Sequence, residues 1–404
     1  MKILMVSEDL PGTQIGGLGK HVVTLANNLL AQGHQVDILG RNDRGLDACA
    51  AQIGFHGRFI PGFDYARPGW KELQLGVFNP LKRPFFAKKI AGAINARARH
   101  YDVVHYHGHL PMTGLYLDPG INYVQTRHDQ GSECLTHLRF RSGEVCTTVT
   151  PQDCSACISA NAGPLRKAVT AVAVRNYREG AAASFGSQKT VFVSEFLRRQ
   201  FLRAVPGADL SRTRVIHNFI DYARLARHTR AAAGEVHRGQ VMLVGRIDAG
   251  KGFGEFLAEA APRLPPHAQV LIVGDGPERE ALAAAYASAR IRFLGWREYD
   301  EAIALAVRSH VCVVPSVCEE ACSTTVLEAL ALGKQCVALA RGGTPELSGY
   351  QRYPGQLQLG ATMRELVGKL VLQLDGAPLV LAPAPAFGAD SLQVIPKLLD
   401  FYAE

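Results

Sequence analysis

The feature that most restricts how this chain can fold is a regular alternation of short β-branched runs with Ala- and Leu-rich stretches from end to end. Strict alternation of strand and helix patterns predicts parallel sheets covered by helices. The expected strands are Lys2–Ser7, Gln35–Gly40, Val103–His107, Tyr123–Thr126, Lys189–Ser194, Arg214–His217, Val241–Gly245, Gln269–Gly274, Ile291–Gly295, Val311–Pro315 and Gln335–Ala340. Between them the sequence predicts helices such as Gly19–Gln32, Phe85–Arg99, Pro277–Ser288 and Thr324–Leu332.

The length of 404 residues exceeds one ordinary core and predicts two domains. The Ala-, Arg- and Gly-rich segment Asp221–Gly239 is the expected linker between them. We therefore predict an α/β protein with one Rossmann-like domain over residues 1–218 and a second over residues 219–389. A final helix, at about residues 390–404, is expected to pack back on the first domain.

Composition narrows the class of protein further. No apolar run reaches the roughly 18 residues that span a bilayer. The start of the chain is typical of a strand and not of a signal peptide, because Glu8 and Asp9 follow it directly, so a cytoplasmic protein is expected. Basic residues interleaved with aromatics, the pattern of nucleic-acid binding, occur only around Asn79–Arg99, so no nucleic-acid partner is expected.

Charged side chains follow the expected strands of the second half. Arg246 and Lys251 come directly after one strand, and Glu320 follows another, with Glu328 in the next helix. Ligands of open α/β sheets bind at the carboxyl ends of the strands. Two cations in a Gly-containing loop neutralise a pyrophosphate well, and the helix start before Glu328 offers free N–H groups to a phosphate. For each motif taken alone, the alternative is a solvated surface loop or helix.

Taken together, these motifs resemble the donor-binding half of the retaining glycosyltransferases of family four. The resemblance rests on GRxxxxKG at 245–252, GDGP at 274–277, FLG at 293–295, PSxxEE with a further Glu at 315–328, and RGGTPE at 341–346. Gly16-Gly17 before the first helix, VSE at 193–195 and VIHN at 215–218 extend it over the whole chain. It implies the GT-B fold, two Rossmann-like doubly wound parallel-sheet domains that face each other across a cleft.

The resemblance also implies roles for individual residues. Arg246 and Lys251 would bind the donor diphosphate with help from the Gly16-Gly17 loop, and Glu328 would bond the ribose. Glu320 and the backbone of the next five residues would hold the sugar and the distal phosphate; these are Ala321, Cys322, Ser323, Thr324 and Thr325. Many relatives have Gly-Phe-Gly after the first Glu, where this chain has Ala321-Cys322-Ser323. The identity of the donor sugar therefore cannot be inferred from these relatives.

A histidine and an aspartate after a strand of the first domain face the reacting sugar in this family. His128 and Asp129 match that place and are the expected catalytic partners of Glu320. Three rivals lie nearby in the sequence, and a lone His is more often a satisfied structural residue than a catalytic one. They are His105, His107 and His109.

Only one group of residues, four cysteines, is a candidate for binding a metal or another cofactor. The chain has no D-x-D motif, so no metal is expected to be required for catalysis. Nicotinamide binding is disfavoured as well, since G-x-G-x-x-G does not follow the first strand. The spacing of Cys134, Cys146, Cys154 and Cys157 leaves two interpretations open, a structural zinc or iron–sulfur site and unliganded thiols.

The segment Asn79–Arg99 carries six cations and no acid beside aromatic and aliphatic residues. As a helix it is interpreted either as an element lying on an anionic membrane or as an ordinary core-facing helix. The first half of the chain also holds the whole net charge of +8, with 23 Lys and Arg against 15 Asp and Glu in residues 1–200. A protein that is peripheral on the inner face of a membrane is therefore one expectation.

The function expected from all of this is retaining transfer of a hexose from a nucleotide diphosphate sugar to a hydroxyl. The acceptor would be a glycan or a lipid-linked intermediate of cell-surface polysaccharide synthesis. Three alternatives stay open: a natural-product glycosyltransferase, a nucleotide-sugar 2-epimerase of the same architecture, and a binding module without turnover.

Overall fold

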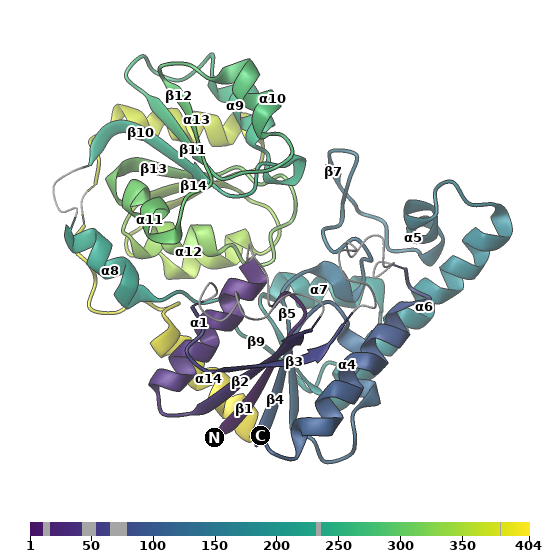
Figure 1. The fold of residues 1–404 in the computed structure, drawn as a ribbon. Coiled ribbons are helices and arrows are strands. Elements are labelled where there is room, and N and C mark those ends of the chain that lie inside the picture. The colour runs from purple at the N-terminus through teal and green to yellow at the C-terminus, as the bar shows by residue number, and fades with distance from the viewer. Residues whose placement is uncertain (11–16, 43–53, 65–78, 232–235, 380) are drawn as a thin grey trace. The chain divides into compact units, whose positions relative to one another are not determined.

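The computed structural model describes residues 1–10, 17–42, 54–64, 79–231, 236–379 and 381–404. The chain divides into two compact units. Unit 1 consists of Met1–Arg139, Thr147–His217 and Val394–Glu404, and unit 2 consists of Phe140–Cys146 and Asn218–Gln393. Each unit has a parallel sheet with helices on its faces (Figure 1). The predicted α/β class with doubly wound parallel sheets is thereby confirmed.

The sheet of unit 1 has the strand order β3-β2-β1-β4-β5-β8-β9, and its strands run parallel. The order reverses between β1 and β4, which is the switch point where ligands of such sheets bind. The strands are β1 (Lys2–Ser7), β2 (Gln35–Arg41), β3 (Arg58–Phe63), β4 (Val103–His107), β5 (Tyr123–Arg127), β8 (Lys189–Phe192) and β9 (Thr213–Val215).

The helices of unit 1 connect these strands and cover the sheet. They are α1 (Gly17–Ala31), α4 (Arg83–Ala98), α5 (Pro151–Ile158), α6 (Pro164–Ser187) and α7 (Glu195–Ala204), with short 3-10 turns η1 (Pro111–Tyr116) and η2 (Gln130–Ser132). The last helix, α14 (Ser391–Ala403), lies among the elements of this unit (Figure 1). Its Tyr402 hydroxyl is 2.6 Å from Nδ1 of His105, inside the sheet.

The sheet of unit 2 has the order β12-β11-β10-β13-β14-β15, again all parallel, with its switch point between β10 and β13. Its strands are β10 (His237–Val244), β11 (Gln269–Val273), β12 (Ile291–Gly295), β13 (Ser309–Val314), β14 (Gln335–Leu339) and β15 (Leu357–Gly360). A two-stranded hairpin, β6 (Phe140–Arg141) and β7 (Glu144–Val145), belongs to this unit, since Phe140 packs against its core.

Two helical layers enclose the sheet of unit 2 (Figure 1). On one face lie α9 (Phe253–Ala260), α10 (Arg279–Tyr286) and α13 (Met363–Asp375), and on the other lie α11 (Tyr299–Arg308) and α12 (Thr324–Ala331), with 3-10 turns η3 (Ala249–Lys251) and η4 (Thr344–Tyr350) in the loops. Buried Val, Ile and Leu of the strands interlock with Phe253, Phe256 and Leu366 of the helices. The core holds the strand ends in place, and these ends carry the polar loops.

The predicted linker Asp221–Gly239 is wrong over most of its length. Residues Tyr222–Ala231 form helix α8, and β10 already begins at His237. Leu225 and Ala226 of this helix are buried, and Arg224 pairs with Asp300 of α11. The Ala- and Arg-rich composition therefore belongs to an amphipathic helix of unit 2.

The segment Asn79–Arg99 contains α4, and its apolar face belongs to the core. Ile90 and Ile94 are fully buried among the residues of the unit 1 core. Arg83 is buried too, while Phe85 is 73% exposed. Most of the apolar face that the membrane interpretation needs is therefore used inside unit 1. No helix in the described ranges is long and apolar enough to cross a bilayer.

Candidate functional site

The loops after β10 and β13 meet at the switch point of unit 2. The backbone N–H of Cys318 donates to the carbonyl of Gly250 over 3.0 Å, so the two loops are joined directly. Two glycines make close contact possible at this edge. Gly252 has a φ of +69°, and a Cβ there would lie 2.2 Å from the carbonyl oxygen of Pro315. A Cβ on Gly274 would lie 1.9 Å from the carbonyl oxygen of Gly245, so both positions require glycine.

Lys251 and Glu320 form an ion pair across these two loops. Nζ of Lys251 lies 2.5 Å from Oε1 of Glu320, and the Ser316 hydroxyl donates to the same oxygen over 2.6 Å. Burial alone would raise the pKa of Glu320, but Lys251 and Ser316 outweigh it and hold that pKa below its usual value. Burial likewise opposes the charge of Lys251, and Glu320 raises its pKa above the usual value. The loops thus hold a half-buried ammonium group next to a carboxylate.

Arg246 differs from Lys251 in its environment. Its side chain is 71% exposed, and Nε lies 3.1 Å from Oδ2 of Asp248 in the same loop. Asp248 caps η3 by accepting from the Lys251 N–H. The structure therefore places both predicted cations on one loop, one anchored and one open to solvent.

The residues from Ala321 to Thr325 form the entry to helix α12. Ser323 is its N-cap residue and makes no side-chain capping bond, and Thr324 and Thr325 are its first two helical residues. The carbonyl of Cys322 accepts from the Asn218 side chain over 2.9 Å. The first N–H groups of a helix lack intrahelical acceptors and carry a partial positive charge. This helix start follows Glu320 directly, so it offers an anion-binding group beside Lys251.

Glu328 lies in the second turn of α12 and has a partner that the sequence motifs did not indicate. Tyr299, the first residue of α11, forms a side-chain hydrogen bond with Glu328. The guanidinium of Arg224 lies 4.6 Å from the centroid of the Tyr299 ring. An aromatic residue at a helix start carries no motif of its own, and only the packing of α8, α11 and α12 brings it to this carboxylate.

Of the Gly16-Gly17 loop, Gly17 begins helix α1. Gly16 lies outside the described residues.

Histidines gather at the switch point of unit 1. His107 ends β4, His128 directly follows β5, and His21 comes from α1. Nδ1 of His107 is 2.9 Å from Nε2 of His128, and the His21 ring centroid is 4.7 Å from that of His128. Burial lowers the pKa of His21 to about 4 and holds those of His107 and His128 well below their usual range. The cluster is therefore uncharged at neutral pH.

His105, one of the alternative catalytic histidines, has contacts typical of a structural residue. It is completely buried, and its two ring nitrogens contact the hydroxyls of Tyr402 and Thr126 at 2.6 and 2.7 Å. Its interactions tie α14 to the sheet.

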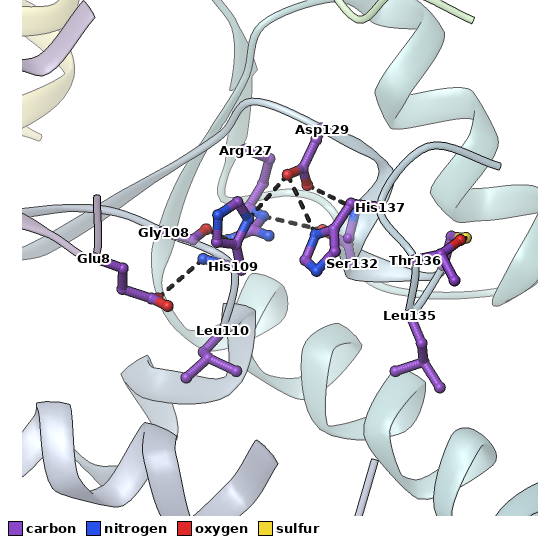
Figure 2. Close-up of polar contacts among 12 residues, drawn as sticks. Glu8, Gly108, His109, Leu110, Arg127, Asp129, Ser132, Leu135, Thr136 and His137 are labelled. Carbon is purple, nitrogen blue, oxygen red and sulfur yellow. Dashed lines mark hydrogen bonds and ion pairs between the residues drawn. The ribbon is translucent and has the colours of Figure 1, made fainter. Parts of the chain in front are cut away.

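Asp129, in the loop after β5, is surrounded by three polar groups, two from its own loop and one from the loop after β4 (Figure 2). Its carboxylate accepts from the Gly131 N–H at 2.8 Å and contacts Nδ1 of His109 at 3.0 Å and Nδ1 of His137 at 3.3 Å. Burial alone would raise the pKa of Asp129, but His137 and His109 outweigh it and hold that pKa well below its usual range. Asp129 is therefore a bound anion that orders the loop.

Arg83 determines the tautomer of His137. Its guanidinium contacts the carbonyls of Gly131 and Leu135 at 3.2 and 3.1 Å, and Nε2 of His137 at 3.0 Å. Arginine only donates, so Nε2 of His137 accepts and Nδ1 carries the proton that faces Asp129. Nothing in the sequence around Arg83, which lies 54 positions before His137, indicated this role.

The sequence left two interpretations open for Cys134, Cys146, Cys154 and Cys157, a structural metal site and unliganded thiols. Two groups of three or more potential metal ligands occur in the described part of the chain, namely His21, His107 and His128, and His109, Asp129 and His137. Neither group includes a cysteine. Cys154 Sγ instead lies 3.1 Å from Nη2 of Arg178, and Cys134 Sγ lies 3.2 Å from the Thr136 hydroxyl.

Comparison with known proteins identifies the family. The glycosyltransferase family 4 profile matches residues 15–224, and the glycosyl transferases group 1 profile matches residues 238–357. The chain is 29% identical to glycogen synthase of Mycobacterium tuberculosis, over 86% of this chain and 80% of that protein. It is 30% identical to sulfoquinovosyl transferase SQD2 of Arabidopsis thaliana over 35% of this chain and 30% of that protein.

Solved structures share the fold over the full length. Anabaena HepE in complex with UDP-glucose matches with a TM-score of 0.63 at 16% identity, covering 100% of this chain and 99% of that one. Sucrose-phosphate synthase from Thermosynechococcus elongatus matches with a TM-score of 0.63 at 19% identity, covering 100% and 98%. The family profiles cover both units, and the resemblance predicted from the motifs is confirmed. The chain belongs to glycosyltransferase family 4 and is a glycosyltransferase of the GT-B fold.

Proposed function

We propose that this glycosyltransferase moves a hexose from a nucleotide diphosphate sugar to a hydroxyl of a glycan or lipid-linked acceptor, with retention at the anomeric carbon. The observation that carries the proposal is the Lys251–Glu320 pair beside the start of α12 at the switch point of unit 2. An ammonium group and free helix N–H groups together suit a diphosphate. HepE, which has the same fold, was solved with UDP and with UDP-glucose.

In this proposal each residue of the unit 2 site binds a different part of the donor. Lys251 and Arg246 neutralise the diphosphate and stabilise its charge as it leaves, Glu328 bonds the ribose, and Glu320 holds the sugar. The backbone of Ala321, Cys322, Ser323, Thr324 and Thr325 supplies donors to the distal phosphate. Because cations and a helix start already serve the diphosphate, we propose that no metal is needed for catalysis.

The environment of Asp129 favours retention over inversion. Inversion needs a carboxylate that is free to take the proton of the attacking hydroxyl. The carboxylate of Asp129 instead contacts Gly131, His109 and His137, and its pKa lies well below the usual range. We assign His128 as the residue that faces the sugar and Asp129, the next residue, as the anion that holds their loop.

We also propose a weak contact with anionic membrane surfaces at the start of α4. Phe85 is 73% exposed there, next to the exposed Lys82 and Lys88. A lipid-linked acceptor would be drawn to the same charge. Vesicles with acidic lipid should sediment the protein at low salt, and replacing these three side chains by Ser should abolish this. Binding that is equal with neutral vesicles would contradict the contact.

A panel of sugar nucleotides with cell lipid extract tests the main proposal. Release of nucleoside diphosphate together with a sugar-labelled acceptor supports transfer. An epimerised sugar nucleotide would indicate the 2-epimerase alternative, and binding without any product would indicate a binding module. A labelled small aromatic or polyketide acceptor, in place of lipid or glycan, would indicate the natural-product class.

A further inference from the structure

Three imidazoles from three separate elements converge at the switch point of unit 1. One ring nitrogen from each of His21, His107 and His128 lies within 4.8 Å of the other two. The ring centroids are 4.7 to 5.6 Å apart. Nitrogens bound to one tetrahedral Zn²⁺ at about 2.0–2.1 Å lie about 3.4 Å from each other. Small rotations of the side chains, which replace the contact between His107 and His128, would therefore bring the three rings to ligand geometry.

His107 adds a second, independent observation. The residue is completely buried, and its Nε2 has no hydrogen-bond partner. Its Nδ1 is used in the contact with His128. An unpaired buried nitrogen destabilises the folded protein and is uncommon. A positively charged ligand among the three rings removes such a cost by accepting a lone pair.

The second cluster of possible ligands does not suit a metal. Arg83 donates to Nε2 of His137, so Nδ1 carries a proton and has no lone pair for an ion. Nδ1 of His109 donates to Asp129, and Nδ1 of His137 lies 3.3 Å from the same carboxylate (Figure 2).

We propose that His21, His107 and His128 bind a divalent transition-metal ion of the Zn²⁺ class. Three imidazoles without a carboxylate select Zn²⁺, Co²⁺, Ni²⁺ or Cu²⁺ over Mg²⁺ and Ca²⁺. Three protein ligands leave a fourth position for water. The ion takes the lone pair of His128, so it competes with the contact of His128 to the donor sugar and inhibits transfer. This last consequence rests on the proposed function, whereas the binding site does not.

The test is titration of the chelator-treated full chain with Co²⁺, read by the visible d–d absorption of four-coordinate cobalt and reversed by Zn²⁺. We expect one equivalent per chain. His21→Gln and His107→Gln should each weaken binding by more than about 100-fold, since even changes behind the ligands cost 10–100-fold. His109→Gln, in the second cluster, and His100→Ala, on the surface, are the controls and should bind as the unchanged protein does.

Thermal melting without metal shows whether each variant is folded, and Zn²⁺ should raise the melting temperature of the unchanged protein but not of folded His21→Gln. The site is disproved by the absence of a cobalt spectrum, by a spectrum with thiolate charge-transfer bands, or by loss of binding in His109→Gln instead of His21→Gln. Because no donor or acceptor is present, these outcomes are independent of whether the proposed transfer occurs.

Discussion

At the scale of single residues, the charges of Lys251 and Glu320 stabilise each other. Glu320 is only 15% exposed, and its charge is compensated by Lys251 and Ser316. Arg246, on the same loop, is largely in solvent. Removing the lysine therefore does more than remove one cation from the proposed donor site, because it also leaves a buried carboxylate without its counter-ion.

The first prediction concerns these two cations. Lys251→Ala should lower the rate of nucleoside diphosphate release about 10²–10³-fold, the usual cost of losing a group that stabilises developing charge. Arg246→Ala should lower it too, by a smaller factor because of its exposure. Arg263→Ala, at an exposed pair with Glu259 on the same unit, is the matched control. Near-normal rates in both loop variants would contradict the assignment of the donor site.

A second prediction separates Glu328 from Glu320. Glu328→Ala and Tyr299→Phe should both raise the KM for the donor with a small change in kcat, since each affects binding of the ribose in the ground and transition states alike. Glu320→Ala should lower kcat as well, because the sugar is no longer held against the acceptor. A kcat effect as large in Tyr299→Phe as in Glu320→Ala would argue against this division.

Motifs located the charged residues at the switch point of unit 2 better than the partners within the histidine clusters. Arg246, Lys251, Glu320 and Glu328 share short loops or one helix with their motifs, so spacing alone locates them. Other residues contact their partners only because distant strands and helices pack together, and no local sequence pattern predicts these contacts. They are His21, Arg83, His137 and Tyr299. Gly16 lies outside the described residues.

At the scale of elements, helix α4 contains a buried arginine at a position where its charge pattern predicts a solvent-exposed one. The sequence shows six cations beside apolar residues, but Arg83 turns inward to two carbonyls, to His137 and to the ring of Tyr177 at 4.6 Å. A count of charges along a helix cannot distinguish a solvated cation from one that organises a core. For the same reason, the composition of Asp221–Gly239 predicted a linker where α8 packs.

The third prediction is that Arg83→Met lowers the free energy of unfolding by about 3–5 kcal/mol, because buried acceptors lose their donor. Arg99→Met, at the exposed end of the same helix, is the control and should change stability by less than about 0.5 kcal/mol. Urea unfolding followed by circular dichroism measures both. Equal effects of the two substitutions would show that Arg83 is not the organising residue.

The fourth prediction concerns Lys334, between α12 and β14. This lysine is 4% exposed, and burial lowers its pKa to about 8. Since the unfolded chain keeps a pKa near 10.4, the unfolded state binds more protons between about pH 8 and 10.4, and stability due to this group rises with pH there. At pH 7 the charged form is disfavoured, so Lys334→Met should stabilise the protein, by up to about 3 kcal/mol.

Urea unfolding at pH 7 and pH 9 checks this, with the exposed Lys397→Met as control. The advantage of Lys334→Met over the unchanged protein should shrink at pH 9, because the native lysine then loses its proton. An advantage that is constant or grows with pH would contradict the depressed pKa.

At the scale of the whole molecule, alternation of strand and helix patterns was enough to predict the fold class. Ten of the eleven expected strands agree with observed strands to within two residues at each end, because β-branched runs end where the sheet ends. Short or edge elements were missed, namely β3, β15 and the β6–β7 hairpin, since each has too few apolar residues for a period to be seen. The two family profiles match sequence in both units, in agreement with the predicted two-domain fold class.

Transfer with retention, from a nucleotide sugar and without a catalytic metal, is the central claim about the whole molecule. The most direct measurement is real-time proton NMR of the reaction with the donor that the panel identifies, recorded after chelator treatment. We expect the first-formed product to have the anomeric configuration of the donor and to form at a rate unchanged by chelation. A first-formed product of inverted configuration would contradict the account and would assign Asp129 as a general base.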